Sequence, residues 1–162
     1  MDKNKLKTEI NKIASQSHEQ DFFSGVDLDF IVPKENLRRF AEILYDNYFM
    51  LNFITAVHTS PESVVVYQFM YPSESFRVRG RVFTGTESSV KTVSDIFSGA
   101  HWYEREVMEF FGIDFEDNPD KRTLILADFD KDLHPLLKKG GKLKSAEDTG
   151  LKEEASKPGE EE

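Results

Sequence analysis

The chain of 162 residues contains no cysteine, and this absence removes several kinds of chemistry at once. Without thiolates, the chain itself has no disulfide, no cysteine-ligated iron–sulfur cluster and no thiolate zinc site. Gly-x-Gly-x-x-Gly, Walker and His-Glu-x-x-His sequences are absent as well. We therefore expect the isolated chain to bind no metal, flavin, nucleotide or iron–sulfur cluster.

Long apolar runs are also lacking. No stretch approaches the length that spans a bilayer, and the polar N-terminus has no signal-peptide core. We expect this chain to reach a membrane only through partners.

Positive charge is scarce relative to negative charge. With 21 Lys and Arg against 30 Asp and Glu, the net charge is −9, which makes nucleic acid a poor partner. Hydrophobic residues make up 38% of the chain and include 14 Phe, enough for the core of one domain.

Hydrophobic periodicity predicts a single α+β domain. Helical spacing marks residues 6–13, a segment opened by Pro33, residues 90–97 and residues 100–111, whereas residues 26–32, 49–57, 64–71 and 76–83 have strand character. Residues 26–32 alternate as a half-buried strand does. The order is α-β-α-β-β-β-α-α, with the helices on one face of a mainly antiparallel sheet.

The division of the chain follows from this pattern. Residues 1–113 form the α+β domain, and residues 114–137 look extended and rich in turns, as an arm that binds a partner. Residues 138–162 have mixed charge and few large aliphatic side chains, so we expect a disordered tail.

The helix over residues 100–111 carries the most distinctive pattern. Trp102, Glu106 and Phe110 fall in one column, so Glu106 lies within an aromatic stripe and needs a partner if it is buried. Arg105 and Glu109, also four apart, can pair with each other. For Glu106 we expect Arg122, beyond the turn at 118–120, to fold back as the partner.

A row of arginines forms a second candidate site. Arg77, Arg79 and Arg81 recur at period two and so point from one face of a strand. A solvated sheet face and a docking surface for an acidic partner both fit this row, and the two interpretations stay open.

A larger pattern begins in the Trp102 helix and resembles one known family. It consists of Glu104-Arg105-Glu106-x-x-Glu109-Phe110-Phe111-Gly112-Ile113-x-Phe115, Asn118-Pro119-Asp120-x-Arg122, Leu124-Ile125-Leu126 and His134-Pro135-Leu136. This is similar to the 30 kDa subunit family of respiratory complex I, the NADH:quinone oxidoreductase. Its homologues serve F420H2 dehydrogenases, membrane-bound NiFe hydrogenases and formate hydrogenlyases. Glu109 and Asn118 depart from the pattern, since the family usually has Asp and His there.

The resemblance implies a role outside catalysis. Such subunits are cofactor-free parts of the peripheral arm of a membrane-bound oxidoreductase, on the cytoplasmic side of the cell membrane. They pack against a hydrogenase-like large subunit and near a small Fe–S subunit, and these partners carry the Fe–S clusters and, in hydrogenases, Ni–Fe. Quinone, protons and sulfur all remain open as the electron acceptor of the parent complex.

The resemblance also assigns the docking residues. We expect the domain–arm junction and the partner contact to involve Trp102, Glu104, Arg105, Glu106, Glu109, Phe110, Gly112, Pro119, Asp120, Arg122, His134 and Pro135. His134 is interpreted as a packing and docking residue. Two other classes stay open: a stand-alone acid–base enzyme that uses Glu106 and His134, and a transient assembly factor.

Overall fold

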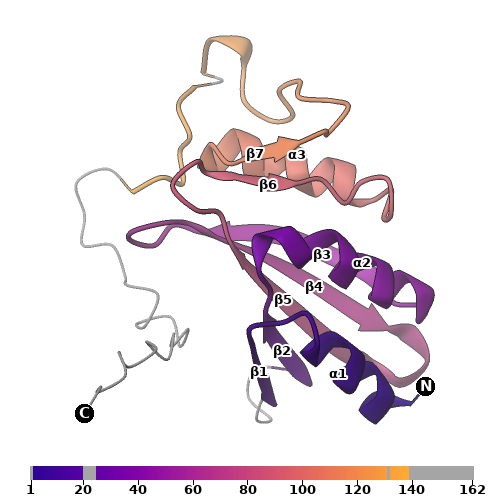
Figure 1. The fold of residues 1–162 in the computed structure, drawn as a ribbon. Helices are drawn as coiled ribbons and strands as arrows, with labels where there is room; N and C mark the ends of the chain where they lie inside the picture. Colours follow the sequence, from indigo (N-terminus) through magenta and orange to yellow (C-terminus); the bar gives the residue numbers. More distant parts are fainter. Residues whose placement is uncertain (1, 20–24, 131, 139–162) are drawn as a thin grey trace, which may run out of the picture.

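The computed structural model describes residues 2–19, 25–130 and 132–138, so most of the tail predicted to be disordered lies outside the described residues. The elements run α1 (Lys3–Asn11), β1 (Gln16–Glu19), β2 (Leu28–Ile31), η1 (Lys34–Asn36), α2 (Leu37–Asp46), β3 (Met50–Val57), β4 (Val64–Tyr71), η2 (Pro72–Glu74), β5 (Phe76–Phe83), β6 (Ser89–Lys91), α3 (Ala100–Phe111), β7 (Asp114–Glu116) and η3 (Asp128–Asp130). The α+β class and the mainly antiparallel sheet are confirmed (Figure 1).

The main sheet has the strand order β1-β2-β5-β4-β3. Only its β2–β5 pair is parallel, with Leu28 opposite Val78, and the pairs β1–β2, β5–β4 and β4–β3 are antiparallel. One core cluster joins the inward side chains of this sheet to those of α1, α2 and α3. Within it the Phe40 ring lies directly over Gly80 of β5, where any Cβ would collide with the ring.

The structure differs from the predicted elements in three details. The segment 26–32 is not half-buried, because β2 runs between β1 and β5 and all four of its residues are buried. Residues 90–97 do not form a helix, since Val90 belongs to β6 and pairs in parallel with Phe115 of β7. The polar strand β1 has no apolar alternation that could have revealed it.

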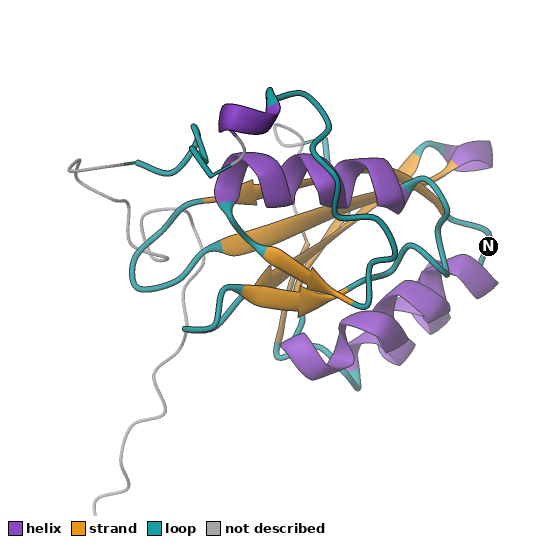
Figure 2. Cartoon of the chain, turned by 90° about the horizontal axis from the view of Figure 1, so that it is seen from above, coloured by secondary structure: helices purple, strands orange, loops and turns teal. Residues whose placement is uncertain are grey.

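The position of α3 sets up the candidate site. Val107 on one side of α3 enters the core, and the chain after β7 passes over the side of α3 that faces away from the sheet (Figures 1 and 2). The helix ends at Gly112, whose φ of +65° is a conformation that side chains with a Cβ rarely adopt.

Candidate functional site

The carboxylate of Glu109 holds one segment of the arm by its backbone. The backbone N–H groups of Leu124, Ile125 and Leu126 donate to the Glu109 oxygens at 3.0, 2.9 and 2.9 Å. Glu109 is buried, at 6% exposure. These residues lie outside any strand, so the carboxylate supplies the acceptors that a sheet partner would otherwise provide.

Arg105 holds the carbonyl side of the same segment. Its Nε donates to the carbonyl oxygen of Arg122 at 3.0 Å, and its Nη2 to that of Thr123 at 2.7 Å. The buried guanidinium also lies 5.2 Å from the centre of the Trp102 ring. We call the side chains of Arg105 and Glu109 the α3 clamp. The predicted pairing between these two residues is wrong, because both side chains bind the arm instead of each other.

A second contact fixes the arm near the end of α3. The His134 Nδ1 lies 3.0 Å from the carbonyl oxygen of Glu109, and the N–H of Leu136 donates to the carbonyl oxygen of Phe110 at 3.1 Å. The His134 ring packs so closely on Gly112 that a Cβ there would lie 3.0 Å from His134 Cδ2. Pro135 is exposed between these two anchored residues.

Glu104, not Glu106, is the fully buried carboxylate of α3. It accepts hydrogen bonds from the Thr92 hydroxyl at 2.5 Å, the Val93 N–H at 2.8 Å and the Asn118 side-chain amide at 2.7 Å. Burial raises the pKa of Glu104, while these three donors oppose the rise. Glu104 thus ties the segment after β6 to the start of the arm. The sequence did not reveal that Glu104 is buried, because no motif marks Thr92 as its hydrogen-bond partner.

Asp120 organises the turn before the clamped segment. It accepts from the backbone and guanidinium of Arg122, and its Oδ2 lies 3.4 Å from Arg105 Nη1 and 3.6 Å from His101 Nε2. The hydrogen bonds from Arg122, followed by the charge of Arg105, hold the pKa of Asp120 well below its usual range. Pro119 precedes it and is exposed.

The expected pairing of Glu106 with Arg122 is wrong. Glu106 is exposed, and the Trp102 side chain beside it is 59% exposed, so the aromatic column faces solvent. Arg122 instead bonds to Asp120. The error came from treating the column of Trp102 as the core face, whereas Val107 marks that face.

The arm presents apolar side chains outward. Exposed fractions are 63% for Ile125, 88% for Phe129, 48% for Leu133 and 51% for Leu136. The anchoring contacts of the arm are made largely by its main chain, and these side chains are exposed.

The arginine row is partly neutralised within the sheet. Arg81 Nη2 lies 2.5 Å and Arg79 Nη1 3.6 Å from Oδ2 of Asp29, which is buried in β2. Burial lowers the pKa of Arg79, and Asp29 opposes this. Arg77 is exposed and donates to the carbonyl oxygen of Gly25 at 2.9 Å. The burial of Asp29 was not predicted, because the alternating pattern of residues 26–32 placed this residue on a solvated strand face.

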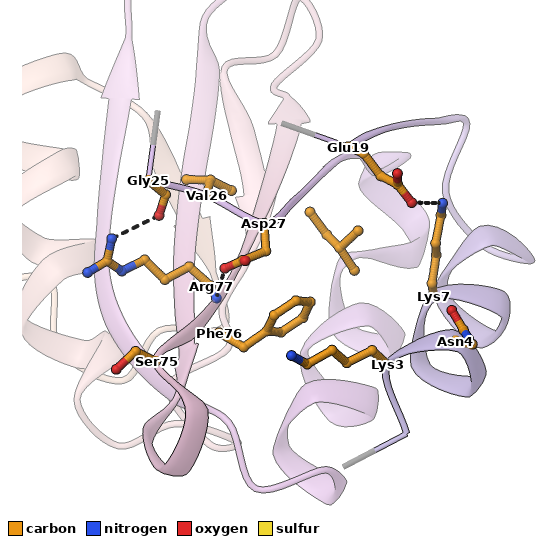
Figure 3. Close-up of a pocket in the computed structure, with 11 residues that line it drawn as sticks. Lys3, Asn4, Lys7, Glu19, Gly25, Val26, Asp27, Ser75, Phe76 and Arg77 are labelled. Atoms are coloured by element: carbon orange, nitrogen blue, oxygen red, sulfur yellow. Dashed lines mark hydrogen bonds and ion pairs between the residues drawn. The ribbon is translucent and has the colours of Figure 1, made fainter. Parts of the chain in front are cut away.

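An open cavity of about 700 Å³ lies at the far end of the molecule, between α1 and the strands β1 and β5 (Figure 3). Lys3 lies 2.8 Å from Glu74, and Lys7 is paired with Glu19. Both of these lysines are therefore neutralised by carboxylates.

No three His, Asp or Glu side chains in the described part of the chain converge in a way that could hold a metal ion. Within residues 2–19, 25–130 and 132–138, no helix is long and apolar enough to cross a bilayer.

Comparison with known proteins first defines a class, subunits of respiratory-chain oxidoreductases. The family model "Respiratory-chain NADH dehydrogenase, 30 Kd subunit" matches residues 30–143, and the chain belongs to this family.

Individual relatives agree with this assignment. An NADH-quinone oxidoreductase subunit of Chelativorans sp. (strain BNC1) is 39% identical over 74 residues, covering 46% of this chain and 36% of that protein. The mitochondrial NADH-ubiquinone oxidoreductase 30.4 kDa subunit of Neurospora crassa is 32% identical over 115 residues, covering 67% of this chain and 40% of that protein. The chain therefore matches well under half the length of these relatives.

A solved structure extends the similarity to the fold. A chain of the membrane-bound sulfane sulfur reductase, an archaeal respiratory membrane complex, superposes with a TM-score of 0.67 at 27% identity. The match covers 82% of this chain and 81% of that one.

Proposed function

We propose that this chain is a cofactor-free structural subunit of the peripheral arm of a complex I-like membrane-bound oxidoreductase. It braces a hydrogenase-like large subunit, near a small Fe–S subunit, and so supports electron transfer to the terminal acceptor. The Fe–S clusters, and Ni–Fe in a hydrogenase, belong to these partners. The chain lies on the cytoplasmic face and reaches the membrane only through them.

One observation carries this proposal: the α3 clamp grips the arm by main-chain atoms and leaves the arm side chains outward. Arg105 and Glu109 together make five hydrogen bonds to the backbone of residues 122–126. A segment fixed in shape before it meets its partner loses less conformational entropy on binding. The arm is therefore suited to lie along a partner.

The parent complex has a second candidate. The similarity to a sulfane sulfur reductase chain favours a sulfur-linked complex beside the quinone-reducing type. An energy-converting hydrogenase is a third candidate for the parent complex. The sequence of the large subunit that binds this chain distinguishes them, because cysteine pairs for Ni–Fe identify a hydrogenase and their absence a quinone- or sulfur-linked complex.

Co-expression with that large subunit tests the proposal. The tagged chain should copurify stably with it, and Arg105→Ala with Glu109→Ala should reduce the yield about tenfold or more, because the arm loses its fixed shape. Glu35→Ala is the control, since Glu35 is exposed and lies outside both α3 and the arm. A large subunit that never copurifies with the wild-type chain, or only transiently, would favour an assembly factor. Turnover of a substrate by the isolated chain would favour an enzyme.

A further inference from the structure

The exposed apolar part of the arm is anchored on both sides. The α3 clamp fixes residues 122–126, and His134 and Leu136 bind the end of α3. Between these anchors the chain turns locally, with the N–H of Asp130 donating to the carbonyl oxygen of Ala127 at 2.8 Å, and that of Leu133 to Asp130 at 2.9 Å. The side chains of Phe129 and Leu133 are therefore presented from a folded segment.

Apolar side chains that are this exposed are unfavourable in water, and docking onto a partner would remove them from water. Phe129, at 88% exposure, contributes almost no packing to the domain, and three further apolar side chains of the arm are about half exposed or more. Aromatic side chains that dock into pockets supply much of the binding energy at protein interfaces. We call the side chains of Ile125, Phe129, Leu133 and Leu136 the apolar ridge.

Aspartates interrupt the apolar ridge. They are not neutralised by a nearby cation that the structure describes, as Asp95 is by Arg38, Asp117 by Lys91 and Asp114 by Lys121. Among the described residues, Asp130 and Asp132 form no ion pair. Asp128 accepts a hydrogen bond from the Thr123 hydroxyl at 3.2 Å but likewise has no ion pair within that part of the chain.

We infer that the apolar ridge docks into an apolar groove of the large subunit whose rim carries basic side chains facing Asp128, Asp130 and Asp132. This inference rests on the proposed function and adds the chemistry of the partner surface. The apolar side chains supply affinity, whereas the carboxylates at the rim select the partner by charge and speed its encounter. Binding should therefore weaken as salt rises, by the part that the rim charges contribute.

The experiment measures binding of the full-length chain to the co-expressed large subunit between about 0.05 and 0.5 M salt. Phe129→Ala should weaken binding about 30-fold at every salt concentration, as expected for a central anchor. Asp130→Asn with Asp132→Asn should weaken binding about fivefold at low salt and flatten the salt dependence. Glu35→Gln with Asp46→Asn is the control, because it changes net charge equally at exposed carboxylates outside the arm.

The outcomes separate the two proposals. A chain that binds normally but whose two aspartates can be neutralised without changing affinity or salt dependence overturns the basic rim and leaves the proposed function standing. Full affinity in Phe129→Ala overturns the docking of the apolar ridge. A wild-type chain that does not bind the large subunit at all overturns both.

Discussion

Two clusters of buried charged side chains, one in the main sheet and one at α3, use their polar atoms in different ways. In the sheet, Asp29 faces Arg79 and Arg81 on the neighbouring strand, and the contacts run from side chain to side chain. At α3, Arg105 and Glu109 do not pair with each other. Both bind main-chain atoms of the arm, and Arg105 also lies 3.4 Å from the Asp120 carboxylate.

The difference follows from what each backbone lacks. Residues of β2 and β5 already satisfy one another through the sheet ladder, so their charged side chains are free to pair. Residues 122–126 have no ladder, and buried N–H and C=O groups without partners are costly. The α3 clamp takes the place of a neighbouring strand.

Removing the carboxylate of the α3 clamp should have the largest effect. Glu109→Ala leaves three backbone N–H groups without their acceptor, and we expect the local stability of residues 124–126 to fall by about 3 kcal/mol. Hydrogen exchange of these amides measures it. Glu106→Ala should stay within about 0.5 kcal/mol of the wild type. Unchanged exchange in Glu109→Ala would contradict the clamp.

Breaking the sheet cluster should cost less and should be reversible. Arg81→Met removes the nearer cation of Asp29 while Arg79 remains, so we expect a loss of about 2 kcal/mol in the free energy of unfolding. Adding Asp29→Val should recover most of it, because an apolar pair replaces a broken ion pair. Urea unfolding measures both, and a double variant as unstable as the sum of the single changes would refute the pairing. No second side-chain substitution can rescue Glu109→Ala, since its partner is backbone.

The glycine that ends α3 offers a sharper local test. Gly112→Ala should destabilise the protein by about 1–2 kcal/mol, because φ is positive and the new Cβ presses on His134. Gly99→Ala, at the other end of the helix, has a helical φ of −65° and open space around its Cβ, and it should be neutral or stabilising. Thermal unfolding of the two variants measures the contrast. Equal midpoints would argue against the packing of His134 on Gly112.

The smallest expected effect concerns pH. Burial raises the pKa of Glu104 above 4.5, so the folded state holds this proton more tightly than the unfolded state does. The stabilisation this provides is complete below the unfolded pKa and is lost as pH rises through the folded pKa. Glu104→Gln removes that contribution, and its unfolding free energy should fall less steeply over this interval. Parallel pH profiles for the two proteins would contradict the raised pKa.

The sequence predicted the elements whose pattern is local. Strands β3, β4 and β5 were expected almost to the residue, because their β-branched and aromatic runs lie between clear turns at Pro61 and Pro72. The helix α3 was also expected, over residues 100–111. Strand β1 and the short β6–β7 pair were missed, because their stability comes from neighbours that no local pattern specifies.

The sequence named several side chains that hold the arm, but not the bonds they make. Glu104, Arg105, Glu109, Asp120 and His134 were named as docking residues, a role that stays a prediction, and the proposed bonds paired side chains with side chains. Helical spacing gives the column a residue occupies but not which column faces the core, and the Trp102 column was assigned to the wrong side. Bonds from side chains to an irregular backbone leave no repeating signal in a sequence.

Recognition through the main chain makes the arm tolerant of substitution. Glu109 accepts hydrogen bonds from three backbone N–H groups, which every residue except proline has. Proline is therefore the substitution that positions 124–126 should not tolerate. The outward side chains can then be exchanged while the grip of α3 persists. Substitutions at a few arm residues would therefore change the surface that the domain presents, with no change to the fold beneath them.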